Sequence, residues 1–178
     1  MRTTIIFSMI LLFSATLLIQ AQENGSVKWY TIDEALKLSK KKPKKIMIDV
    51  YTDWCGWCKK MDKETFNNPE IAKYLNENYY PVKFNAESST PVTYLGKTYI
   101  NEGNVARSSH QLAVALLNGQ MSYPSIVFMD EKQQLITPVP GYRDAKSFEP
   151  LLYFIFLDKY KNNVNYDEYQ KTFKGKVK

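Results

Sequence analysis

The sequence predicts an α/β protein in which a mixed central sheet is flanked by helices on both faces. Three observations support this prediction. An apolar run without polar alternation, residues 45–51, is typical of a buried central strand. A helical segment and a second strand-like run, residues 79–85, complete a strand–helix–strand unit. Two strand-like runs around a turn, residues 125–139, then lead into a closing amphipathic helix, residues 146–160.

The first expected helix covers residues 31–41. Its start carries a capping-box sequence from Thr31 to Glu34, in which the side chain of each of these two residues can accept the backbone N–H of the other. Beyond the strand at 45–51, the segment 59–66 has a helical pattern until the chain reaches Pro69. Proline is favoured in the first turn of a helix, so Pro69 is expected to open a further helix over residues 70–76.

An inserted segment, residues 86–120, precedes the strand that follows Pro124. It contains a hairpin-like pattern at 92–100 and a predicted helix at 105–118. Because it lies just before Pro124, the segment is expected either to border a functional site and select substrates or to be a surface elaboration. After the closing helix, a short helix is expected at about 167–173.

The composition is that of a folded domain. Apolar residues make up 44% and aromatic residues 14% of the chain, which argues against disorder. The formal net charge is +6, and the lysine-rich run at 40–45 supplies much of it. Because this run joins a predicted helix to a predicted strand, we interpret it as a solvated connection. It has no interleaved aromatic residues, so no nucleic-acid partner is expected.

The N-terminus is expected to be a secretory signal peptide, residues 1–21. Arg2 precedes an apolar run at 5–19 that is short for a membrane span, and Ala21 supplies a small residue at its exit. The mature protein, residues 22–178, would then be one periplasmic or secreted domain that does not span a membrane. The alternative is that the apolar run stays attached as an N-terminal membrane anchor.

Cys55 and Cys58 are the two cysteines of the sequence, and they form a C-x-x-C motif after the first strand. This spacing can close a disulfide in the first turn of a helix, where unpaired N–H groups favour a thiolate on the first cysteine. Zinc needs four ligands, and the nearest histidine, His110, is about fifty residues away, so no metal is expected. His110 itself is interpreted as a surface residue at a helix start.

The chain resembles the thioredoxin-fold family, and more narrowly the exported thioredoxin-like proteins with a Cys-Gly-x-Cys-Lys-x-Met segment. The resemblance covers about residues 30–160 and leaves 161–178 as a C-terminal tail. The matching features, in chain order, are Ile48-Asp49-Val50, Trp54, the cysteine motif, Val82-Lys83-Phe84-Asn85, Tyr123-Pro124-Ser125 and Gly141 before the last helix.

The resemblance implies a role for each of these residues. Cys55 would be the more exposed, attacking thiol, and Cys58 the resolving thiol. Pro124 would be a cis proline facing the cysteines, with the backbone of Tyr123 pairing with a substrate peptide; the alternative is that Pro124 only begins a strand. Trp54 would either face the substrate or be a packing residue, and Trp57 would either contact a partner or only cover the helix end.

Asp49 interrupts a strand that is expected to be buried. A buried carboxylate is costly unless it is paired or protonated. The resemblance implies that this acid accepts or relays the proton of Cys58, and we expect the transfer to pass through a water. The alternative interpretation is that Asp49 only pairs with Lys83.

These features together predict an exported protein disulfide oxidoreductase. It would reduce or isomerise disulfides through a reversible Cys55–Cys58 bond, without any other cofactor. The motif lacks the histidine of strong thiol oxidants, which favours a more reducing couple. The expected partners are polypeptide disulfides and a membrane-bound dithiol electron donor. The alternative function is a thioredoxin-fold adaptor or chaperone that holds clients without redox turnover.

Overall fold

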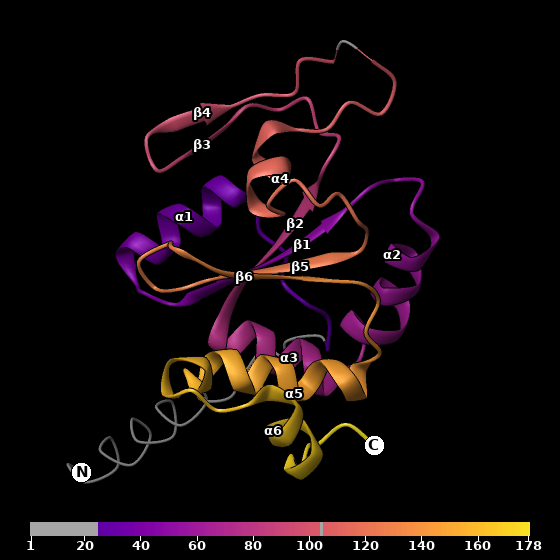
Figure 1. The fold of residues 1–178 in the computed structure, drawn as a ribbon, viewed down its shortest axis with the longest axis vertical. Coiled ribbons are helices and arrows are strands. Elements are labelled where there is room, and N and C mark those ends of the chain that lie inside the picture. Colours follow the sequence, from indigo (N-terminus) through magenta and orange to yellow (C-terminus); the bar gives the residue numbers. More distant parts are fainter. Residues whose placement is uncertain (1–24, 104) are drawn as a thin grey trace, which may run out of the picture.

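A four-stranded sheet lies at the centre of the molecule, with the strand order β2-β1-β5-β6 (Figure 1). The computed structural model describes residues 25–103 and 105–178, so the expected signal peptide lies outside the described residues. Strand β1 pairs in parallel with β2 and antiparallel with β5, and β5 pairs antiparallel with β6. The strands are β1 (Lys45–Tyr51), β2 (Tyr79–Asn85), β5 (Ser125–Met129) and β6 (Leu135–Pro140).

Helices cover both faces of this sheet, as predicted (Figure 1). Helices α1 (Ile32–Lys41) and α4 (Gln111–Leu116) pack on one face, with Ile48 of β1 in the same apolar cluster. Helices α3 (Pro69–Asn78) and α5 (Ala145–Phe156) pack on the other face, with Met47. Because side chains alternate along a strand, Asp49 points to the same face as Met47.

The helix starts follow the predicted capping chemistry. In α1, the Thr31 hydroxyl accepts the backbone N–H of Glu34, and the Glu34 carboxylate accepts the backbone N–H of Thr31. Pro69 opens α3 behind an Asn68 cap, so this helix begins where the sequence placed it. Within the described part of the chain, no helix has both the length and the apolar character needed to cross a membrane.

The helix after the cysteines is not uniform. Helix α2 (Gly56–Met61) passes into one turn of π-helix, η1 (Asp62–Phe66), which the sequence did not predict. The wider turn is closed by a bond from the Asn67 N–H to the Asp62 carbonyl, 3.2 Å long. In this turn, the Asp62 side chain reaches Lys83 on β2. Single π turns of this kind occur often at functional sites.

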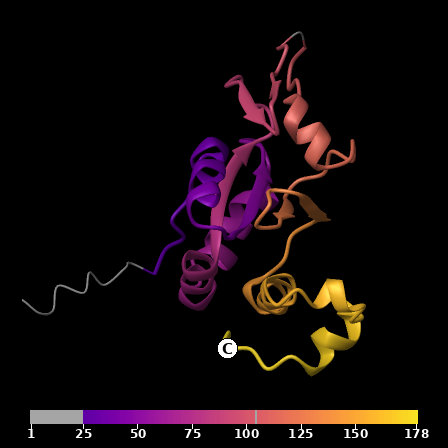
Figure 2. The same ribbon diagram turned by 90° about the vertical axis from the view of Figure 1, so that its left-hand side faces the viewer.

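The inserted segment contains a small two-stranded sheet, β3 (Val92–Tyr94) and β4 (Lys97–Tyr99), as the hairpin-like pattern predicted. Helix α4 is shorter than predicted, because the chain from 105 to 110 is not helical. Figure 2 shows the insertion and the C-terminal segment at opposite ends of the molecule.

The expectation that His110 is a surface residue is wrong. His110 does begin helix α4, but its side chain is fully buried. Its Nδ1 accepts the backbone N–H of Leu112 at 3.0 Å, so Nε2 carries the proton and donates to the Thr90 carbonyl at 3.1 Å. Burial lowers the pKa of His110, and the bond to Thr90 only partly opposes this. His110 is therefore a neutral helix cap.

The lysine-rich run is only partly a solvated connection. Lys40, Lys41 and Lys42 are exposed, as expected. Lys45 is buried, and its Nζ lies 2.7 Å from a Glu131 oxygen and 3.0 Å from an Asp158 oxygen. These carboxylates raise the pKa of Lys45 against the opposing effect of burial. The ion pairs of Lys45 tie β1 to the segments that follow β5 and α5.

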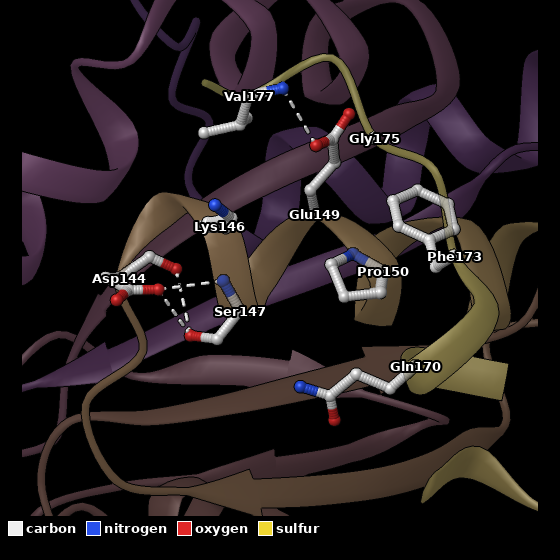
Figure 3. Close-up of a pocket in the computed structure, with 9 residues that line it drawn as sticks. All are labelled: Asp144, Lys146, Ser147, Glu149, Pro150, Gln170, Phe173, Gly175 and Val177. Carbon is white, nitrogen blue, oxygen red and sulfur yellow. Dashed lines mark hydrogen bonds between the residues drawn. The ribbon is translucent and has the colours of Figure 1, made fainter. Parts of the chain in front are cut away.

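The C-terminal segment folds back against α5 (Figure 3). It contains η2 (Lys159–Asn162) and α6 (Tyr166–Thr172), close to the short helix that was predicted. The buried carboxylate of Glu149 accepts the backbone N–H groups of Lys176 at 2.7 Å and Val177 at 3.0 Å. A cavity of about 390 Å³ lies between this segment and the start of α5; its lining includes Asp144, Ser147, Glu149 and Phe173.

Candidate active site

The two cysteines lie where β1 ends and α2 begins. They form a disulfide with a Cα–Cα distance of 5.3 Å. Cys55 is the N-cap of α2, and its Sγ accepts the backbone N–H of Cys58 at 3.1 Å. In this oxidised form both residues are buried, with 5% of Cys55 and 2% of Cys58 exposed. The expected order of exposure is therefore present, but the difference is small.

The sheet register places Pro124 at the same end of the two central strands as the cysteines. Because β1 and β5 are antiparallel and Val50 pairs with Ser125, the end of β1 lies beside the start of β5. The Tyr123–Pro124 bond is cis, which confirms that prediction. The Pro124 carbonyl accepts the backbone N–H of Gly141 at 2.8 Å, so the residues before α5 also lie at this end of the central strands.

Trp54 forms one side of the site and is half exposed. Its ring packs edge-to-face on Tyr123, with 6.0 Å between the ring centroids. Its indole N–H donates to Glu87 at 2.9 Å, and the guanidinium of Arg107 lies 4.8 Å from its ring centroid. The sequence singled out Trp54 and Tyr123, but it did not predict the contacts from Glu87 and Arg107.

Trp57 forms the other side, and 58% of it is exposed. Its ring lies 5.3 Å from that of Tyr142, and the Lys60 ammonium lies 5.1 Å from the Trp57 centroid. The Tyr142 hydroxyl donates to Glu64 at 2.6 Å. This bond raises the pKa of Tyr142 to about 12, because loss of the phenol proton would break it. Exposed aromatic pairs with fixed rings are suited to contact a polypeptide.

Beneath α2, a lysine holds two carboxylates together. Asp49 on β1 and Lys83 on β2 are register partners, and Lys83 Nζ lies 2.5 Å from Asp49 Oδ2. Lys83 also pairs with Asp62 of the π turn. The two acids raise the pKa of Lys83 against the opposing effect of burial. The expected pairing of Asp49 with Lys83 is confirmed, whereas its role in proton transfer stays a prediction.

Asp62 is a candidate functional residue that the sequence analysis missed. It stands four residues after Cys58, which on a helix places the two side chains on a similar face. That spacing was the available signal. The π turn begins at Asp62 itself, and this irregularity is not visible in the sequence pattern.

Burial raises the pKa of Asp49 to about 6 from its ordinary 3.8, against the pull of Lys83. Only 1% of Asp49 is exposed, and its Oδ1 accepts no hydrogen bond from the residues that the structure describes. A carboxyl with this pKa is partly protonated near neutral pH. It can therefore both accept and release a proton in that range.

The pH dependence of stability should reveal the raised pKa of Asp49. Between pH 3.8 and about pH 6, the folded protein binds more protons than the unfolded chain. The wild type therefore loses stability as the pH rises through this range. We expect Asp49→Asn to lack this loss. The unfolding free energy of the variant should therefore rise relative to that of the wild type by about 2 kcal/mol between pH 4 and pH 7. Urea unfolding of the oxidised proteins measures both curves, and parallel curves would contradict a raised pKa.

Comparisons with known proteins agree with this architecture. The profile of a family described as "Thioredoxin-like domain" matches residues 32–156. The "Thiol:disulfide interchange protein DsbD" of Salmonella typhi is 29% identical over 127 residues, which cover 69% of this chain and 19% of that protein. The protein of the same name from Escherichia coli (strain K12) is 32% identical over 125 residues, covering 66% and 18%. The chain thus spans about a fifth of the length of these relatives.

Solved structures show the same fold at low sequence identity. A thioredoxin-fold protein from Helicobacter pylori has a TM-score of 0.57 at 19% identity, covering 84% of this chain and 89% of that one. A thioredoxin from Thermus thermophilus has a TM-score of 0.54 at 18% identity, covering 73% and 87%. These likenesses confirm the predicted thioredoxin-like fold.

Proposed function

Because this chain belongs to the thioredoxin-like domain family, we propose that it is an exported thiol–disulfide oxidoreductase that reduces or isomerises disulfides in polypeptides. The observation that carries the proposal is the Cys55–Cys58 disulfide, which follows the central strand β1 at the end where Pro124 precedes β5. Two exposed tryptophans flank this disulfide. The relatives named as thiol:disulfide interchange proteins support the same class of chemistry.

The reaction begins from the reduced protein, in which both cysteines are thiols. The Cys55 thiolate attacks one sulfur of the substrate disulfide, and the other substrate sulfur leaves as a thiolate that takes up a proton. The Cys58 thiolate then attacks Cys55 Sγ in the mixed disulfide, which forms the Cys55–Cys58 bond and releases the second substrate thiol. Two electrons and two protons pass from the protein to the substrate.

We assign the proton transfer at Cys58 to Asp49. The Cys58 thiol must lose its proton before it attacks, and a carboxylate with a pKa of about 6 is better matched to this task near neutral pH than an ordinary one. Lys83 holds Asp49 through an ion pair and so positions it. A water between the carboxylate and Cys58 would carry the proton.

Regeneration needs an external dithiol, because the structure holds the oxidised form and each turnover consumes two electrons. We propose that a membrane-bound dithiol protein supplies them outside the cytoplasm. The signal-peptide pattern at residues 1–21 supports this location.

The reduction potential of the Cys55–Cys58 couple tests the proposed direction of electron flow. We expect a value near the −270 mV or so of thioredoxin rather than the −120 mV or so of strong thiol oxidants. Alkylation of the protein in graded dithiothreitol buffers, followed by mass spectrometry, measures it. Reduction of insulin by the wild type would accompany this value.

Two outcomes would contradict the proposal. A potential near that of the strong oxidants would reverse the direction of electron flow. Binding of unfolded clients without any insulin reduction would instead favour the adaptor function, since exposed Trp54 and Trp57 could hold clients without redox turnover.

A further inference from the structure

The inserted segment contributes one wall of the active site. Glu87 lies at its beginning and Arg107 in its middle, and both contact Trp54, the residue before Cys55. A polypeptide that contacts Trp54 as its disulfide reaches Cys55 would therefore lie beside these two side chains. The insertion is placed to influence which polypeptides react.

Hydrogen bonds within the inserted segment connect the parts of this wall. The Asn101 amide donates to the Glu87 carbonyl at 3.0 Å and to the Ser108 carbonyl at 2.7 Å, so it ties the two parts of the wall together. Arg107 has a φ of +58°, a conformation that non-glycine residues rarely adopt and that persists only where the surroundings impose it. The backbone of Arg107 is therefore set by the fold at this turn, and the contact with the Trp54 ring places its guanidinium.

The Arg107 guanidinium is available to a ligand. It lies over the Trp54 ring and is exposed. Throughout residues 25–103 and 105–178, no carboxylate forms an ion pair with it. A guanidinium stacked on a ring keeps the N–H donors at its edge free, and their planar arrangement matches a carboxylate. By contrast, Lys60 on the opposite side of the site already pairs with Glu64 at 3.8 Å.

A hollow of about 300 Å³ adjoins this wall. Its lining residues include Arg107, Glu87, Ser89 and Ser108. One carboxylate oxygen of Glu87 accepts the Trp54 indole N–H. The hollow is large enough for an amino-acid side chain, and the Arg107 cation that lines it suits an acidic one.

We propose that Arg107 is a specificity-determining residue that binds an aspartate or glutamate side chain next to the reacting cysteine of the substrate. This inference rests on the proposed disulfide reductase function. Charge complementarity carries it, because the site presents an unpaired guanidinium directly beside the residue that precedes Cys55. Glu87 has the opposite charge and limits the preference.

Matched peptide substrates test the inference. A set of peptides, each with one internal disulfide, would differ only in a Glu, Gln or Lys within two positions of the attacked cysteine. For the wild type we expect kcat/KM to be about three- to tenfold higher for the best Glu peptide than for its Lys counterpart, with the difference mainly in KM. High salt should reduce this ratio, because the contact is exposed.

The variants separate Arg107 from general charge effects. Arg107→Gln should bring the Glu-to-Lys ratio close to one, and Glu87→Gln should raise the ratio above that of the wild type. Lys97→Gln is the control, since Lys97 is an exposed cation on β4 of the same insertion and contacts Tyr99 rather than Trp54. This variant should keep the wild-type ratio.

The possible failures are distinguishable. If the wild type reduces no peptide, the proposed function fails. If it reduces all peptides but shows equal values for Glu and Lys, or prefers Lys, the function stands and the role of Arg107 is refuted. A ratio that falls equally in Lys97→Gln and Arg107→Gln would also refute it, because the effect would then come from net charge.

Discussion

Replacing Cys55 with serine is expected to lower the rate of disulfide reduction by about a thousandfold or more, to the background of the chemical reductant. A serine hydroxyl is not ionised near neutral pH, so it cannot attack a disulfide, and the Cys55–Cys58 bond can no longer form. Insulin reduction with limiting dithiothreitol measures the rate. The fold should persist, because a disulfide that closes a two-residue loop adds little stability through chain entropy.

Cys58→Ser provides the matched variant. It retains the attacking thiol but cannot resolve the mixed disulfide, so it should accumulate covalent complexes with its substrates. A double variant with both cysteines replaced should capture none. If Cys55→Ser instead trapped substrates while Cys58→Ser was inactive and trapped none, the assigned roles of the two cysteines would be reversed.

Replacing Lys83 with methionine is expected to destabilise the protein by about 3 kcal/mol at pH 8. The change leaves the buried carboxylate of Asp49 without its counter-ion, and either ionisation or protonation of that carboxylate is then costly. Near pH 4 the Asp49 carboxyl is protonated in the folded protein and no longer needs a counter-ion, so the loss should become small. Urea unfolding at both pH values measures the difference.

Two further proteins make this experiment specific. Lys60→Met removes a lysine from an exposed pair and should cost less than about 0.5 kcal/mol. In a Lys83→Met/Asp49→Asn double variant the buried charge is gone, so most of the loss at pH 8 should be recovered. A single variant that loses the same stability at pH 4 and pH 8 would show that Lys83 acts through packing alone, for example through its contacts with Trp29 and Phe66.

The strands of the sheet could be predicted from the sequence because their signals are local. Residues 45–51, 79–85 and 125–129 are each strands over the predicted range. Each is a short apolar run that ends at a turn, and burial on both faces of the sheet makes such runs continuous. The capping box of α1 and the proline that opens α3 are local signals as well.

The errors concern residues whose environment comes from distant parts of the chain. The composition of residues 105–110 allows a helix. In the structure, however, the His110 side chain bonds to the Thr90 carbonyl, and the helix begins only after His110. Lys45 belongs to a basic run, yet Glu131 and Asp158, which follow β5 and α5 in the chain, form ion pairs with it. Sequence periodicity carries no information about such partners.

The same limit applies to the candidate site. The cysteine motif, Asp49 and Pro124 could be identified because their residue types and order are specific. Glu87 is separated from Trp54 by 33 positions, and Arg107 by more, so their meeting depends on how the insertion folds. Asp62 lies close to the cysteines in sequence, but its approach to Lys83 occurs in a π turn.

The way Glu149 holds the C-terminal segment has a consequence for sequence variation. Its carboxylate recognises main-chain N–H groups, which every amino acid except proline possesses. Position 176 can therefore diverge widely among homologues and still be bound. A Cβ on Gly175 would collide with the Glu149 carboxylate, so a side chain there would displace that carboxylate and weaken its bonds to the main chain. Substitutions should thus be tolerated better at position 176 than at position 175.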